Sequence, residues 1–180
     1  MPSERIRTVL LGLAFLIFLI LSYVENTIFF QILKDILQNI SLAIVMLFIH
    51  NVLVISLILL GMTFYVNLVI SNFFKRERYG QIVLEHPRTF AMVFTIMIIF
   101  LSILRGSNLL YGGVSVEALP LILLVSAPIG IVEGYGIYLI IKKTLSRTMS
   151  MKDLAYIYGI FLIAAIMEVG FMNFLVMIST

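Results

Sequence analysis

Residues 126–141 read SAPIGIVEGYGIYLII, and this stretch decides the fold class because it is apolar enough for lipid yet carries one carboxylate, Glu133. A carboxylate at the centre of a bilayer costs about 2.5–3.5 kcal/mol on insertion scales, so an acid retained there marks a site or a packing contact. The whole chain has the same character, with 62% hydrophobic and 12% charged residues. Soluble domains carry about 25% charged residues. The composition therefore predicts an integral membrane protein.

Five apolar runs have about the 20 residues that cross roughly 30 Å of hydrocarbon. We expect an all-α, polytopic membrane helix bundle that forms a single domain over residues 1–180. Its transmembrane helices are predicted at 8–24, 52–74, 89–104, 119–141 and 154–177, separated by charged loops at 75–88 and 142–153. An interfacial amphipathic helix is predicted at about 27–47, because Ile28, Ile32 and Ile36 share a stripe opposite Lys34 and Gln38.

The basic residues lie mainly on one side of this five-span arrangement. Ten of the twelve Lys and Arg residues do so: Arg5, Arg7, Lys75, Arg76, Arg78, Arg88, Lys142, Lys143, Arg147 and Lys152. This excess predicts a multi-pass protein of the cell membrane with a cytoplasmic N-terminus and an external C-terminus. Because the charges form short runs between spans, no nucleic-acid binding is expected. The expected partners are the lipid bilayer and either further copies of the chain or other membrane proteins.

Five polar residues are candidates for an intramembrane site, namely Glu133, Glu168, Asn67, His50 and Asn51. By position along their spans, the heights of Glu133 and Glu168 differ by roughly 8 Å. The same count places Asn67 near the height of Glu133, which makes it a candidate hydrogen-bond donor to that acid. A protonated, purely structural Glu and a Glu that exchanges a proton or cation both fit this pattern.

His50 and Asn51 interrupt the apolar stretch FIHNV near the outer end of the second predicted span. One interpretation makes His50 a proton acceptor or metal ligand. The interpretation we favour makes both residues polar anchors at an elbow between the interfacial helix and the span.

Small residues form a candidate packing ridge in the fourth span. Ser126, Gly130 and Gly134 recur every four residues around Pro128, which permits another helix to approach closely. Ala164 and Ala165 precede Glu168 in the fifth span. We expect these two small-residue faces to pack together.

Motifs for catalysis are absent from the sequence. The chain has no cysteine, no Gly-x-Ser-x-Gly, no His-Glu-x-x-His and no phosphate-binding loop. No catalytic residue, cofactor or metal is expected, and the protein is predicted not to be an enzyme.

Three segments, FIHNVLVISLILLGM, APIGIVEGYGIYL and IAAIMEVGFMN, resemble in order and spacing the stage II sporulation protein M family of integral membrane proteins. The resemblance covers most of the chain and includes Asn51, Gly61, Pro128, Gly130 and Glu133. It departs from the family pattern at Ile129, where the family usually has histidine. The resemblance implies a scaffold-like membrane component, without a sporulation role.

Two functions follow as expectations. The first is a non-enzymatic scaffold or subunit of a membrane complex that packs through the glycine ridge. The alternative is a transporter or channel subunit that uses Glu133 and Glu168 for proton or cation movement.

Overall fold

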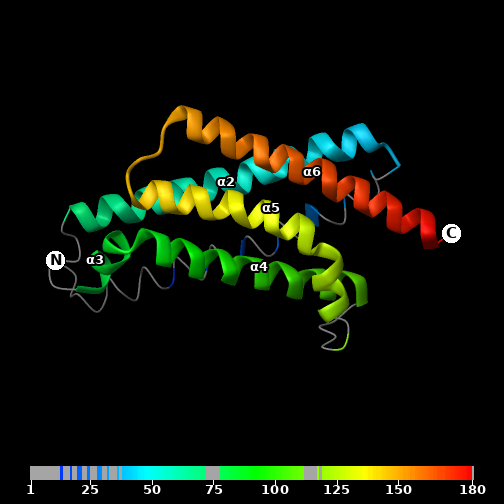
Figure 1. Ribbon diagram of the computed structural model, residues 1–180, viewed down its shortest axis with the longest axis horizontal. Coiled ribbons are helices and arrows are strands. Elements are labelled where there is room, and N and C mark those ends of the chain that lie inside the picture. The colour runs from blue at the N-terminus through cyan, green and yellow to red at the C-terminus, as the bar shows by residue number, and fades with distance from the viewer. Residues whose placement is uncertain are drawn as a thin grey trace.

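The computed structural model describes residues 38–71, 78–111, 117 and 119–179, together with single positions between 13 and 36. Every regular element in these ranges is an α-helix, which confirms the all-α class (Figure 1). The helices are α2 (Ile40–Ile70), α3 (Arg78–Glu85), α4 (Pro87–Tyr111), α5 (Leu119–Leu145) and α6 (Met151–Ser179).

These helices differ in whether their length and apolar composition are sufficient to cross a membrane. Among the described residues, α2 and the Met151–Asn173 part of α6 are long and apolar enough to cross a membrane, two helices where five were predicted. A shorter apolar helix covers Pro87–Phe100. Within the first predicted span, 8–24, and within residues 27–37 of the predicted amphipathic helix, the structure describes single positions only.

Helix α2 begins twelve residues before the predicted start of the second span. Asn39 is its N-cap: the Asn39 side chain accepts a hydrogen bond from the Leu42 N–H at 3.1 Å, and the Asn39 N–H donates to the Ile36 carbonyl at 2.8 Å. An asparagine cap satisfies a first-turn N–H that has no partner within the helix. The predicted elbow at His50 and Asn51 is therefore wrong, because both lie inside α2, and residues 40–47 belong to α2 as well.

Helices α3 and α4 replace most of the predicted loop at 75–88. Pro87 occupies the first position of α4, where its missing N–H leaves no helical hydrogen bond unmade. Helix α4 then continues to Tyr111, past the predicted end at 104. Arg105 and Gly106 do not end it, because arginine is a good helix former and one glycine costs only about 1 kcal/mol.

Helix α5 starts at Leu119 as predicted and extends four residues beyond the predicted end at 141. It closes in a Schellman motif, in which the Thr148 N–H donates to the Lys143 carbonyl at 2.9 Å and the Arg147 N–H to the Thr144 carbonyl at 3.0 Å. Arg147 adopts a left-handed φ of 56° to make this turn.

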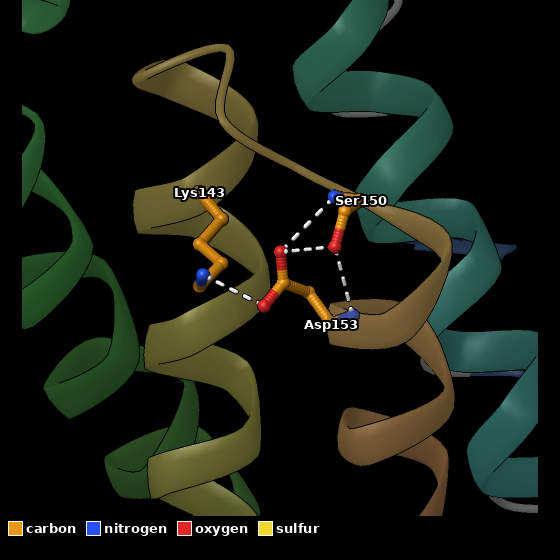
Figure 2. Close-up of polar contacts among 3 residues, drawn as sticks. All are labelled: Lys143, Ser150 and Asp153. Atoms are coloured by element: carbon orange, nitrogen blue, oxygen red, sulfur yellow. Dashed lines mark hydrogen bonds and ion pairs between the residues drawn. The ribbon is translucent and has the colours of Figure 1, made fainter.

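The start of α6 is capped reciprocally by Ser150 and Asp153 (Figure 2). The Asp153 N–H donates to Ser150 Oγ at 3.2 Å, and the Ser150 N–H donates to Asp153 Oδ2 at 3.1 Å. Lys143 Nζ on α5 donates to Asp153 Oδ1 at 2.8 Å. The predicted loop 142–153 is thus reduced to residues 146–150, and the α5–α6 hairpin is fastened at its turn.

Helix α5 lies at the centre of the bundle and contacts α2, α4 and α6, while α2 also contacts α6. Helices α2 and α5 run in one direction, and α4 and α6 run in the other (Figure 1). One core cluster joins four helices through Ile55, Val66, Ala91, Ile137, Ile140, Ile141, Leu145, Ile157 and Phe161. A second cluster joins α2 to α6 through Ala43, Leu47, Ala165 and Val169.

Candidate functional site

Glu133 lies on the inner face of α5 and is half-buried. It precedes Ile137 by one helical turn and Ile140 by two, and both isoleucines belong to the core cluster that joins α5 to its neighbours. Residues four and seven positions apart lie on the same face of a helix. The acid is therefore directed into the bundle rather than toward its outer surface.

Asn51 of α2 lies at the same level of the bundle as Glu133. Ser56 of α2 contacts Tyr158 of α6, and Gly136 of α5 meets Phe161, which lies three residues after Tyr158 on α6. Because α6 runs opposite to both α2 and α5, these two contacts set the register of α2 against α5 and place Asn51 within a turn of the height of Glu133. The structure therefore places at one level two predicted site residues that lie 82 positions apart in the chain.

Thr95 of α4 approaches the same level from the other side of α5. Its Cγ2 lies 3.6 Å from the position that a Cβ would occupy on Gly134, the residue next to Glu133. Thr95 is buried, and no sequence pattern singles it out, because a lone threonine in an apolar run fits ordinary helix packing. Only the placement of α4 against Gly134 identifies it as a site residue.

Two polar atoms at this level are enclosed by protein. Asn51 Nδ2 and Thr95 Oγ1 have no hydrogen-bond partner among the described residues. Leaving such a group unsatisfied costs about 1–3 kcal/mol, so buried polar groups are normally paired with protein or with water. This level of the bundle therefore encloses two polar groups within a largely apolar core.

His50 is buried on α2, and its ring stacks on Phe29 with centroids 3.8 Å apart and an interplanar angle of 12°. The stacked ring, rather than an elbow, accounts for the burial of this residue within a continuous helix. In the described part of the chain no group of three or more His, Asp or Glu side chains is arranged to hold a metal ion.

Glu168 is half-buried on the inner face of α6, one turn after Ala164 and Ala165, which are both fully buried. The register of α5 against α6 is given by Gly136, which meets the Phe161 ring. By that register Glu133 and Glu168 lie about four to five residues apart along the bundle axis, or roughly 6–8 Å.

Asn67 does not reach Glu133, so the predicted pairing is wrong. Its side chain is exposed, and it lies 16 residues after Asn51 on the same helix, or roughly 24 Å along the axis. The error follows from the predicted boundary at 52, because a helix that starts at Ile40 has its midpoint near Ile55 instead of near residue 63.

The predicted glycine ridge does not face α6 as a unit. A Cβ on Gly134 would lie 2.6 Å from Ile99 Cδ1 of α4, whereas no described atom is within 4 Å of a Cβ on Gly130. Pro128 is exposed. The glycine that packs against α6 is Gly136, which meets Phe161. The Gly-Tyr-Gly spacing could have predicted that the two glycines contact different helices, because residues two positions apart lie about 200° apart around a helix.

A hydroxyl pair adds a further polar contact between α2 and α6, where Ser56 Oγ and Tyr158 Oη are 3.5 Å apart. Ser56 also donates to the Val52 carbonyl at 2.7 Å, which satisfies its hydroxyl within α2.

Comparison of the chain with protein-family models, with curated proteins and with solved structures returned no match.

Proposed function

We propose that the protein is a non-enzymatic integral membrane protein of the stage II sporulation protein M type, acting as a scaffold or subunit of a membrane complex. The observation that carries the proposal is the distribution of side chains on the long helices. Leu60, Val93 and Ile131 point outward with 67%, 61% and 71% of their surface exposed, while Asn51 and Thr95 are buried. Apolar side chains that cover the outer faces, with a few polar side chains enclosed in an otherwise apolar core, suit lipid, whereas a water-soluble bundle carries polar outer faces.

The proposed five-span topology, with the N-terminus in the cytoplasm, is supported by the location of the basic residues. Helices α2 and α5 end, and α4 and α6 begin, at the same end of the bundle, on the left in Figure 1. The described basic residues of this end are Arg78, Arg88, Lys142, Lys143, Arg147 and Lys152. An excess of Lys and Arg at one end is typical of the cytoplasmic side.

A scaffold role is supported by the close packing of α5 and α6. Gly136 lets the Phe161 ring approach the α5 backbone, and Ala164 and Ala165 are fully buried on α6. Small residues at helix contacts permit the close approach on which association in lipid depends. Because Gly134 is covered by α4 within the same chain, we no longer assign this glycine to a contact with a partner.

The test is a flux assay in proteoliposomes that contain the parent protein, Glu133→Gln or Glu168→Gln, with a pH-sensitive dye inside and imposed proton and sodium gradients. A scaffold gives no flux above that of empty vesicles. Glu133→Gln should keep the helicity and oligomeric state of the parent, because glutamine has nearly the shape and hydrogen-bonding capacity of a protonated glutamate. Flux in the parent that Glu133→Gln abolishes would overturn the scaffold proposal.

Flux in the parent that is lost in Glu133→Gln would favour the alternative function, a transporter or channel subunit in which Glu133 and Glu168 move a proton or cation. The observation in its favour is that Asn51 Nδ2 and Thr95 Oγ1 are enclosed at about the level of the inward-facing Glu133. Intramembrane carboxylates in such surroundings are common on ion and proton pathways.

A further inference from the structure

We propose that the outer edge of the contact between α4 and α5 binds one anionic phospholipid. Arg88 and Lys142 hold its phosphate at the basic end of the bundle, and its acyl chains lie along both helices toward the middle of the bilayer. The proposal takes the membrane location from the proposed function and goes beyond the scaffold role, because neither a scaffold nor a transporter requires a particular lipid. The surface belongs to two helices, since α4 supplies the arginine and α5 the lysine.

Arg88 and Lys142 lie at similar heights on the two helices. The reference contact is Gly134 of α5, where an added Cβ would lie 3.6 Å from Thr95 Cγ2 of α4. Because α4 and α5 are antiparallel (Figure 1), seven residues back from Thr95 and eight residues on from Gly134 lead toward the same end of the bundle. These steps reach Arg88 and Lys142. The two cations therefore lie within about one helical turn of each other in height.

On α4, Arg88 lies at the edge of the contact that faces away from α2. Arg88 precedes Thr95 by two turns and so shares the face of α4 that packs on α5. The flank beside it carries the exposed Met92 and Ile96, whereas Ala91, on the opposite flank, belongs to the core cluster that includes residues of α2. Arg88 itself is exposed.

On α5, Lys142 lies at the same edge. Tyr138 and Lys142 follow Gly134 by four and eight residues, and each step of four turns the position by about 40° around the helix. This rotation leads away from Ile137 and Ile140, which belong to the core cluster shared with α2. Lys142 Nζ lies 5.5 Å from the centroid of the Tyr138 ring, so the ring holds the ammonium group over the outer side of α5.

The positive charge at this edge is not neutralised by the described part of the chain. There, the ion pair at the basic end joins Lys143 to Asp153 of α6, and neither Arg88 nor Lys142 pairs with a carboxylate. Arginine donates paired hydrogen bonds to phosphate oxygens, and lysine adds a compact charge. Basic pockets between transmembrane helices on the cytoplasmic side are typical of sites for anionic lipid headgroups.

The rest of the edge is apolar, which favours a lipid over a soluble anion. Met92 and Ile96 of α4 and Ile131 and Tyr135 of α5 are all exposed. They lie four to eleven residues from the cations, or roughly 6–17 Å toward the middle of the bundle. A phospholipid has the same order of groups, a charged phosphate followed by acyl chains. Inorganic phosphate or an acidic peptide would contact the cations and leave the apolar strip uncovered.

The experiment is native mass spectrometry of the full chain in a non-ionic detergent, titrated with phosphatidylglycerol or with phosphatidylcholine that carries the same acyl chains. The parent should retain one phosphatidylglycerol per chain and bind it roughly tenfold or more tightly than phosphatidylcholine, because two cations contribute. Arg88→Gln and Lys142→Gln should each weaken the binding of phosphatidylglycerol about fivefold and leave that of phosphatidylcholine unchanged. Circular dichroism checks that each variant keeps the helicity of the parent.

Matched controls separate this site from a general effect of positive charge. Lys152→Gln removes an exposed lysine of the same end that lies on α6, and it should bind phosphatidylglycerol as the parent does. If Lys142→Gln does not fold, Lys142→Arg keeps the charge and should keep the lipid. An excess of inorganic phosphate should not displace the lipid.

Equal affinity for the two lipids overturns the proposal, as do equal effects of Arg88→Gln and Lys152→Gln. Displacement of the lipid by inorganic phosphate would assign the cations to a soluble anion, and a dimer in place of the lipid adduct would assign the surface to a second copy of the chain. Either result also overturns the proposal. The flux assay is independent of all these results, so a failure here leaves the proposed function standing.

Discussion

At the scale of the residue, Asn51 and Arg147 show two ways in which surroundings set the cost of a side chain. Asn51 is buried, and its amide nitrogen has no hydrogen-bond partner among the described residues, although an amide in lipid-like surroundings normally requires one. Arg147 is exposed but holds a φ of 56°, a left-handed conformation that residues with a Cβ adopt at a cost. Neither free-energy cost can be recognised from the sequence, because each depends on how the surrounding helices end and pack.

Arg147→Gly is expected to stabilise the protein by roughly 0.5–1 kcal/mol, because glycine accepts the left-handed conformation of a helix C-terminus without steric strain. Thermal unfolding in detergent micelles measures the effect. Lys152→Gly, in the first turn of α6, is the control and should destabilise, since glycine inside a helix loses more conformational entropy. A lower melting temperature for Arg147→Gly would contradict the strain argument.

The Asp153 carboxylate makes stability depend on pH in the acid range. Asp153 precedes the apolar run that begins at Leu154, and its hydrogen bonds from Lys143 and then Ser150 lower its pKa from 3.8 to about 2. Since the pKa is lower in the folded state, the stabilisation is fully present above pH 3.8 and is lost as the pH falls through 2.

Melting temperatures of the parent and Asp153→Asn should therefore differ at pH 5 and converge as the pH approaches 2. Glu85→Gln, which changes an exposed carboxylate at the same end of the bundle, is the control and should show no such convergence. A difference between the parent and Asp153→Asn that stays constant down to pH 2 would rule out this ionic contribution.

At the scale of the element, α5 is defined by which neighbour each of its small residues receives. Gly134 faces Ile99 of α4, and Gly136 faces the Phe161 ring of α6. Glu133 lies between these two flanks and is directed toward α2. Helix α5 therefore has three packing faces. Small residues lie on the faces toward α4 and α6, and the acid lies on the face toward α2.

Gly136→Ala is expected to cost about 1–3 kcal/mol, because the added methyl group meets the ring of Phe161, which is 4% exposed and has little room to move. Thermal unfolding checks the loss, and Gly136→Ala with Phe161→Leu should recover part of it. Gly159→Ala is the control, since no described atom lies within 4 Å of a Cβ there. That variant should be neutral or slightly stabilising, because alanine is the better helix former. Equal effects of the two single variants would refute the packing argument.

At the scale of the whole molecule, the basic end of the bundle sets the orientation that we propose in the membrane. The chain contains no cysteine, so single cysteines report accessibility without a background. Thr148 lies in the α5–α6 turn at the basic end, and Glu117 lies two residues before α5 at the opposite end. Both side chains are exposed.

Glu117→Cys should react with a membrane-impermeant maleimide in intact cells, and Thr148→Cys only after permeabilisation, because the positive end is expected in the cytoplasm. Mass-tag labelling followed by gel electrophoresis measures this. The reverse pattern would invert the topology. Labelling of both cysteines in intact cells would mean that α5 does not cross the membrane.

The helical class and the approximate location of most helices could be predicted from the amino-acid sequence, because apolar composition and run length depend only on the chain. Leu119 is the start of a predicted span and of α5 alike. Boundaries were less predictable where capping competed with polarity. Asn39 caps α2, whereas His50 and Asn51, which looked like a break, are carried inside the helix.

The tertiary structure alone decided which residues form the candidate site. Glu133 was identified as an intramembrane acid from its apolar surroundings in the sequence, but its neighbours depend on the register between helices, and hydrophobicity does not encode register. Because α2 starts at Ile40 and not at the predicted residue 52, Asn51 lies near the level of Glu133, and Asn67 lies toward the basic end of the bundle. Thr95 enters only because α4 packs on Gly134. One-dimensional patterns specify which face of a helix is buried, and only the packed helices specify what each buried group meets.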